Sequence, residues 1–306
     1  MLTALLIFNI YSMSISFEPA DAISDAISDF NIAAVGDWGC NSNTDATVKN
    51  MVEKSPELVL ALGDYSYQAT GTCWFFKTLP IDNITKITIG NHEDEVGEGF
   101  EQYMNHFKLT SPYYSYNYQN LHIIIMSTSL DYSIGSEQYD FVVSDLQSAS
   151  QDPTINWIIV SPHYWMYRSS NISHVSNDLA EIYHPVFDKY QVDLVLSGDI
   201  HNYQRTYPMR YNPNNISSPI IDNKNPNRYV DPQGTIFIIV GTGGINRSPL
   251  KGTSPFVVQQ QDDYYGHLNI KFTNEGNSIE GKFYKNGDGM TLDSFFITKF
   301  KQASDS

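Results

Sequence analysis

The chain has 306 residues, of which 41% are hydrophobic and 13% aromatic, and its formal net charge is −16. This length allows one large domain or two small ones, and the composition is typical of a globular protein, not of a disordered or fibrous one. The negative charge repels a phosphate backbone, so it argues against nucleic-acid binding. A site for a small anion would therefore need a local positive centre.

Residues 1–22 predict a secretory signal peptide. Their apolar segment is short for a membrane span and ends at Ala20-Asp21-Ala22, which resembles a cleavage site. No Lys or Arg precedes the apolar segment, so an uncleaved membrane anchor and a poorly ordered terminus are the alternatives. Residues 23–306 are expected to form one secreted or cell-surface catalytic domain, without membrane contact after cleavage.

Seven apolar, β-branched segments predict strands that are buried on both faces. They cover residues 31–39, 57–67, 85–93, 121–129, 156–164, 192–201 and 234–244. Amphipathic segments between them predict helices at 44–54, with a cap at Thr44, at 136–149 and at 177–190. This order predicts a layered α/β fold with a parallel or mixed sheet.

Two later regions have a different pattern. Residues 202–233 are rich in Asn, Pro and Tyr and predict a long surface loop. Arg205 would be a solvated arginine of this loop, with contact to a phosphate as the alternative. From residue 264 onward, apolar and polar residues alternate between Gly and Asn turns, which predicts antiparallel strands. The Tyr-rich segment at 111–120 is expected to pack as an edge strand.

Five of the predicted strands end in acidic, imidazole or amide side chains. These are Asp37, Asp64 with Tyr67, Asn91 with His92, His163, and Asp199 with His201. Because ligands gather at the carboxyl ends of strands in open α/β sheets, these side chains are expected to meet in one crevice. Three carboxylates in such a crevice would repel one another and raise their pKa values unless a cation lies among them.

The residue types indicate which cation this is. Carboxylates, imidazoles, an amide and a phenol suit Fe, Mn or Zn, and no thiolate is needed. Seven ligands exceed what one open catalytic ion would hold, so two metal ions are predicted. A glycine precedes the ligands and permits tight turns there, at Gly36, Gly63, Gly90 and Gly198.

The blocks GDWG, GDYSY, GNHE, VSPH and GDIH occur in this order between residues 36 and 201. In order and approximate spacing they resemble the five blocks of calcineurin-like metallophosphoesterases. Tyr67, three residues after Asp64, is similar to the purple acid phosphatase branch. The resemblance implies a two-sheet mixed β-sandwich flanked by helices.

The resemblance also implies a ligand set. Asp37, Asp64, Tyr67 and His201 would bind the first metal, ferric iron in that branch, and Asp64 would bridge to the second. Asn91, His163 and residue 199 would bind the second metal, which would be Fe, Mn or Zn. The family pattern there is Gly-His-x-His, whereas this chain has Asp199.

The carboxylate at 199 adds one negative charge. It should favour a harder second ion, raise the pKa of a bridging water and weaken attraction for an anionic substrate. The alternative is a site that has lost its second metal.

The implied activity is dinuclear metal-dependent hydrolysis of small phosphate monoesters, with a metal-bridging hydroxide as nucleophile. His92 is the candidate general acid, and His174 would assist it. A phosphodiesterase on the same scaffold and a catalytically silent binding domain are the alternatives.

Cys40 and Cys73 each follow one of these blocks. In an exported chain they predict a disulfide between neighbouring loops, with two unrelated buried thiols as the alternative. The remaining histidines in helix or strand patterns are taken as structural or surface residues: His106, His122, His184 and His267. Glycosylation sequons, which matter only in a host that glycosylates, begin at Asn83, Asn171, Asn215 and Asn246.

Overall fold

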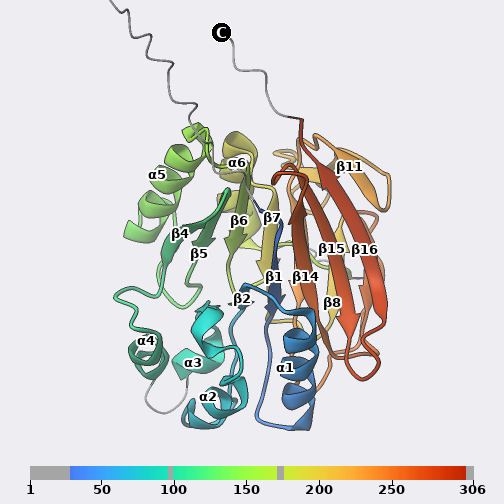
Figure 1. Cartoon of the computed structure of the whole chain (residues 1–306). Coiled ribbons are helices and arrows are strands. Elements are labelled where there is room, and N and C mark those ends of the chain that lie inside the picture. Colours follow the sequence, from blue (N-terminus) through green and yellow to red (C-terminus); the bar gives the residue numbers. More distant parts are fainter. Residues whose placement is uncertain (1–27, 96–98, 171–175, 301–306) are drawn as a thin grey trace, which may run out of the picture.

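A computed structural model of the chain describes residues 28–95, 99–170 and 176–300 (Figure 1). The predicted signal peptide lies outside these residues. The described part contains two seven-stranded mixed sheets flanked by helices, as the sequence predicts. None of its helices combines the length and hydrophobicity that crossing a membrane requires.

The first sheet has the strand order β11-β16-β15-β14-β1-β2-β3. Its parallel part consists of β1 (Phe30–Val35), β2 (Leu58–Ala61) and β3 (Thr85–Ile87). β14 (Gly266–Thr273) pairs antiparallel with β1 and continues into the meander β15 (Ser278–Lys285) and β16 (Thr291–Thr298). β11 (Arg228–Val230) pairs parallel with β16 at the edge. The alternating pattern after residue 264 therefore forms the antiparallel strands that it predicts.

The second sheet has the order β13-β8-β12-β7-β6-β5-β4. Its parallel centre is β5 (Leu121–Ile125), β6 (Trp157–Ser161), β7 (Leu194–Ser197) and β12 (Ile236–Val240). Antiparallel strands lie outside it: β4 (Tyr114–Tyr118) on one side, and β8 (Tyr203–Thr206) and β13 (Val257–Gln261) on the other. The Tyr-rich β4 is an edge strand, which confirms that prediction.

The helices form the outer layers. α5 (Glu137–Gln151) and α6 (Asp178–Tyr190) pack on the second sheet, and α1 (Ser42–Lys54) packs on the first (Figure 1). Shorter helices follow β2 and β3: α2 (Thr72–Thr78), the 3-10 turn Asp82–Ile84, α3 (Asn91–Glu95) and α4 (Glu101–Phe107). A small hairpin is formed by β9 (Met209–Arg210) and β10 (Ile220–Ile221).

One apolar cluster joins the two sheets. It contains Ile32 and Leu60 from the first sheet together with Ile123, Ile159 and Leu196 from the second. A second cluster fills the space between the second sheet and helices α5 and α6. Because the central parallel strands have apolar layers on both sides, their sequences are almost continuously apolar.

Two local predictions are wrong. The segment 202–233 is not one surface loop, because its first residues form the fully buried strand β8 between β12 and β13. Helix α1 is capped by Asn41, whose side chain accepts hydrogen bonds from the backbone N–H groups of Asn43 and Thr44. The Thr44 hydroxyl instead donates to the carbonyl oxygens of Trp38 and Gly39.

Candidate metal centre

The predicted ligands lie at the carboxyl ends of strands from both sheets. Asp37 follows β1, Asp64 and Tyr67 follow β2, and Asn91 follows β3. His163 follows β6, and Asp199 and His201 follow β7. The loops after these five strands therefore bring together residues from Asp37 to His201, which are far apart in the chain.

Tyr67 lies at the middle of one half of the site. Its hydroxyl oxygen is 3.2 Å from Asp37 Oδ1, 3.1 Å from Asp64 Oδ2 and 3.2 Å from His201 Nε2. His201 Nε2 is also 3.3 Å from Asp37 Oδ1. Ligand atoms of Asp37, Asp64 and His201 all lie within 4.8 Å of one another, which is a geometry that can hold a metal ion.

His163 connects Asp64 to the other half of the site. Its Nε2 is 3.3 Å from Asp64 Oδ1 and 3.2 Å from Asn91 Oδ1, and the ring is fully buried. Asp199 is half-buried, and its charge acts on both Asp37 and His163. The two carboxylate oxygens of Asp64 thus face different halves of the site.

Backbone carbonyls orient the two imidazole rings. His163 Nδ1 is 2.7 Å from the Leu62 carbonyl oxygen, and His201 Nδ1 is 2.7 Å from that of Asn246. Since a carbonyl oxygen only accepts, each Nδ1 carries the proton and donates it. Each Nε2 is thereby turned toward the carboxylates, as in metal-ligating histidines.

The charges in the site are incompletely compensated. Asp37 is fully buried, and its Oδ2 has no hydrogen-bond partner among the described residues. Burial, and then the negative charge of Asp64, raise the pKa of Asp37 well above its usual range. Burial lowers the pKa of His163, but Asp64 and Asp37 outweigh this effect and raise it to about 10. An orphaned, buried carboxylate oxygen among oxygen and nitrogen donors fits a metal cation.

The backbone at the site is strained. Asp37, Asp64, Tyr67 and Asp199 have φ angles of 60°, 55°, 54° and 68°, in the left-handed region that non-glycine residues rarely adopt. Such strain is common where a fold positions functional groups. Gly63 and Gly90 are required for a different reason, since a Cβ would overlap the His163 ring at the first and the Asp64 carboxylate at the second.

Glu93 is a buried acid whose role the sequence interpretation missed. Its carboxylate accepts hydrogen bonds from the backbone N–H groups of Asp64, Tyr65 and Gly90, at 2.8, 2.8 and 3.0 Å. It therefore fastens the loop that carries Asp64 to the loop that carries Asn91. In the sequence, the feature that could have pointed to Glu93 is its position as the last residue of the GNHE block.

His92 lies at the mouth of the site. Its side chain is 36% exposed, and its ring packs on Tyr67 with the ring centroids 4.2 Å apart. The backbone N–H of His92 donates to Asp64 Oδ1 at 3.0 Å. The imidazole is thus adjacent to the ligands but accessible from outside. His174 lies outside the described residues.

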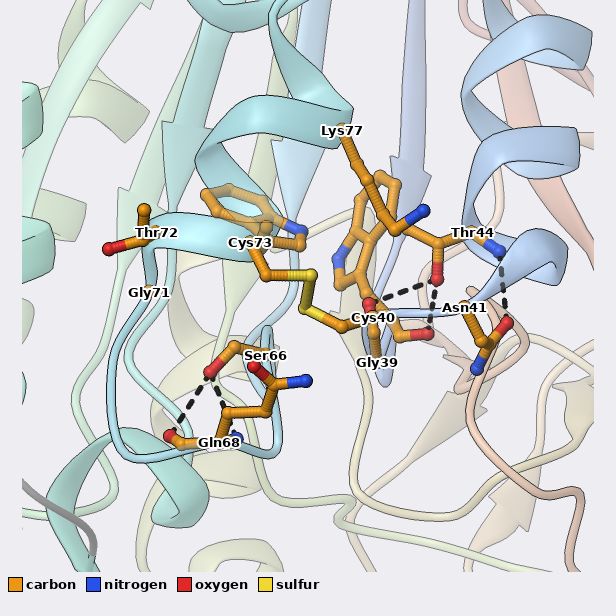
Figure 2. Close-up of a disulfide and its surroundings, with 12 residues drawn as sticks. Gly39, Cys40, Asn41, Thr44, Ser66, Gln68, Gly71, Thr72, Cys73 and Lys77 are labelled. Carbon is orange, nitrogen blue, oxygen red and sulfur yellow. Dashed lines mark hydrogen bonds between the residues drawn. A yellow bond between two sulfur atoms is a disulfide. The ribbon is translucent and has the colours of Figure 1, made fainter.

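The predicted disulfide is present and joins two loops of the site. It links Cys40, three residues after Asp37, to Cys73 at the start of α2, with the Cα atoms 6.0 Å apart (Figure 2). Lys77, also on α2, binds the Asp45 carboxylate of α1 at 2.7 Å. The loop after β1 is therefore bound covalently to the segment that follows Tyr67.

Among the other interpreted residues, Arg205 differs from the prediction. It is not solvated, since only 1% of its surface is exposed, and it binds Asp293 between the sheets. His122, His184 and His267 are buried, as structural residues would be, and His106 is exposed, as a surface residue would be. Asn83, Asn215 and Asn246 are exposed, and Asn171 lies outside the described residues.

A family model, calcineurin-like phosphoesterase, matches residues 30–203, which is more than half of the chain. The chain belongs to this family. The matched region contains all five motif blocks.

Curated relatives include purple acid phosphatase 15 of Arabidopsis thaliana, 27% identical over 255 residues, which are 70% of this chain and 44% of that protein. Phosphoenolpyruvate phosphatase of Allium cepa is 27% identical over 297 residues, 86% of this chain and 59% of that protein. The chain thus spans about half the length of these relatives.

Solved structures share the fold. Purple acid phosphatase PPD1 from yellow lupin superposes with a TM-score of 0.73 at 22% identity, covering 89% of this chain and 54% of that chain. GAP50, described as the anchor in the inner membrane complex of Plasmodium, superposes with a TM-score of 0.68 at 14% identity and covers 89% and 91%.

Proposed function

We propose that this chain is a dinuclear metal-dependent phosphatase that hydrolyses small phosphate monoesters. The observation that carries the proposal is the convergence of Asp37, Asp64 and His201, whose ligand atoms lie within 4.8 Å of one another. The second carboxylate oxygen of Asp37 is buried and lacks a partner among the described residues. Membership of the phosphoesterase family supports the reaction class. The purple acid phosphatase relatives support monoesters as the substrate class.

Two sets of ligands would hold the ions. Asp37, Tyr67 and His201 would hold the first and His163, Asn91 and Asp199 the second, with Asp64 shared because its two oxygens face both sets. The donors fit iron in the first position and Fe, Mn or Zn in the second. Ions held by these residues would activate a water molecule as the nucleophile and would neutralise negative charge on the phosphate oxygens.

The neighbouring residues position these groups and move the proton. His92 donates a proton to the leaving oxygen, and its packing on Tyr67 holds the ring at the open side of the site. His174 assists this transfer. Glu93 and the Cys40–Cys73 disulfide keep the ligand loops together.

The disulfide also supports export, because such bonds persist in oxidising compartments. We accordingly propose a leader at residues 1–22 and a secreted or cell-surface catalytic domain at 23–306.

Elemental analysis combined with assays of 4-nitrophenyl phosphate and bis(4-nitrophenyl) phosphate tests the function. We expect close to two metal ions per chain and faster turnover of the monoester. Faster turnover of the diester would replace the proposal with a phosphodiesterase. Two bound metals without turnover of either, after loading with Fe, Mn or Zn, would favour a silent binding domain.

Asp199→His tests the unusual ligand. If Asp199 binds the second ion, the imidazole should change the metal stoichiometry or the choice of metal, because it removes one negative charge. An unchanged metal content and metal preference would contradict contact between residue 199 and the ion.

A further inference from the structure

A pocket of about 220 Å³ lies beside the metal centre. Its lining includes Trp165, Arg168, Asp199, Asn202, Gln204 and Lys251. Asp199 belongs to both places, because it lines the pocket and its charge acts on His163 and Asp37. The pocket and the metal centre are therefore neighbours that share Asp199.

The pocket is positively charged in a strongly negative chain. Among the described residues that line it, Arg168 and Lys251 are cationic and Asp199 is the only carboxylate. The Arg168 guanidinium lies 4.3 Å from the ring centre of Trp165, which restricts the orientation of its donors. In a chain with a net charge of −16, a local excess of positive charge is the feature that an anion needs.

Hydrogen bonds between segments distant in sequence hold the walls of the pocket. Gln204 accepts from the backbone N–H of Ser169 at 2.6 Å and donates to Asn202 Oδ1 at 2.9 Å. Asn202 in turn donates to the Ser248 carbonyl at 3.2 Å. The Ser169 hydroxyl accepts from the Ser254 N–H at 3.0 Å. The pocket is thus formed before a ligand arrives, as binding sites usually are.

The volume limits what the pocket can hold. At about 30 Å³ per water molecule, it has room for roughly seven waters. That is enough for a carboxylate or phosphate group on a short carbon chain. It is smaller than the roughly 300–1,000 Å³ of pockets for drug-sized ligands, so a large aromatic leaving group would not be enclosed.

We propose that this pocket binds a second anionic group of the substrate, a carboxylate or a phosphate carried by the leaving group. The inference rests on the proposed phosphatase function and narrows its substrate class to phosphate monoesters that carry a second anionic group. Arg168 and Lys251 would supply the positive charge that attracts this group. The two cations also offset the extra negative charge of Asp199 toward an incoming anion.

Matched substrate pairs test the proposal. 3-Phosphoglycerate and glycerol 3-phosphate differ by a carboxylate, and fructose 1,6-bisphosphate and fructose 6-phosphate differ by a phosphate. In one of the pairs, we expect kcat/KM to be at least about tenfold higher for the member that carries two anionic groups. The pair with the larger ratio identifies the group that the pocket binds.

Variants locate the effect. Lys251→Met and Arg168→Met should each lower that ratio about tenfold, mainly through KM, and Arg168→Lys should restore part of it. 4-Nitrophenyl phosphate has no second anionic group, so its turnover measures in each variant the loss that is independent of the pocket. Lys224→Met is the matched control, since Lys224 is exposed and does not line the pocket.

Ratios near one for both pairs, with normal turnover of 4-nitrophenyl phosphate, would overturn this inference and leave the proposed function intact. Equal losses on all substrates in Arg168→Met, together with loss of metal, would show that Arg168 only positions Asp199. Calorimetric titration of the metal-free protein, which does not turn these compounds over, keeps the test independent of turnover. There, equal affinities within each pair would also overturn the inference.

Discussion

Asp293 and Asp37 are both buried, but they differ in their partners: an arginine binds both oxygens of Asp293, whereas one oxygen of Asp37 has no partner among the described residues. Between the sheets, Asp293 of β16 binds Arg205 of β8 through two hydrogen bonds, 2.6 Å from Nε and 2.8 Å from Nη2. The Tyr203 hydroxyl donates a third at 2.7 Å. At the metal centre, Asp37 is also buried, but its neighbours are Asp64, a phenol and an imidazole.

This difference separates a structural site from a functional one. A buried carboxylate that is paired with a cation of the same chain has its charge neutralised and has no free oxygen for a ligand. A buried carboxylate with an unpartnered oxygen keeps its desolvation cost until a cation binds, so it is a candidate cation-binding site. Burial of acids alone would not have distinguished the two regions.

Asp37→Asn should have the largest effect on activity. The amide keeps the shape of the side chain but removes the charge that attracts the metal. Since losing a residue behind the ligands typically costs 10- to 100-fold, we expect the loss of a ligand to lower kcat/KM by at least about 100-fold. Turnover of 4-nitrophenyl phosphate and metal content measure the loss.

The same variant sharpens the comparison when the metal is removed. Without metal, the amide of Asp37→Asn avoids the cost of burying a charge next to Asp64, so the chelated variant should unfold at a higher urea concentration than the chelated wild type. With metal, the order should reverse. A chelated variant that is less stable than the wild type would mean that the Asp37 carboxylate is satisfied within the protein.

Arg205→Met should mainly affect stability. It leaves Asp293 buried without its cation, which costs about 3–5 kcal/mol in the free energy of unfolding. The double variant Arg205→Met with Asp293→Leu removes both charges and should recover most of the loss. Urea unfolding measures both variants. If the double variant were as unstable as the single one, packing and not charge would explain the effect.

His267 is buried in a third kind of environment, without a hydrogen-bonding partner among the described residues. Its replacement has the smallest expected effect on the free energy of unfolding. Neither ring nitrogen has a partner among the described residues, and burial, followed by the charge of Lys54, lowers its pKa from 6.5 to about 3. The unfolded chain therefore binds a proton below pH 6.5 that the folded chain does not bind. The neutral His267 therefore contributes to the free energy of unfolding in full above pH 6.5, and this contribution is lost as the pH falls toward about 3.

His267→Phe should remove that dependence. At pH 4.5 the wild type should have lost roughly 2–3 kcal/mol on account of His267, relative to pH 7.5. The variant should lose less stability by this amount over the same interval. Urea unfolding of both proteins at the two pH values measures the difference, and parallel losses would show that the His267 ring is solvated or paired.

Much of the fold was predictable because local signals agreed with tertiary packing. Segments such as 156–164 and 234–244 are continuously apolar, since their strands have apolar layers on both faces. Strand β8 was missed because its sequence, Tyr-Gln-Arg-Thr, is mostly polar. Its side chains find their partners far away in sequence, as Arg205 does in Asp293, and no local pattern reveals such a pair.

The site was predictable to a similar extent. Short blocks identified Asp37, Asp64, Tyr67 and His201, and the structure brings these four residues into mutual contact. The blocks did not reveal that Glu93 fastens two of the loops, or that Arg168 lines a pocket next to Asp199. Both features depend on contacts between segments that follow different strands.

By itself, the sequence determined the kinds of elements and the chemistry at their ends, because apolar runs, caps and turn glycines act within a few residues. The tertiary structure alone decided which buried charges are paired inside the chain and which are left for a cation. It also decided where a positive pocket opens beside them. These outcomes depend on which distant side chains share one low-dielectric interior, and a linear pattern does not contain that information.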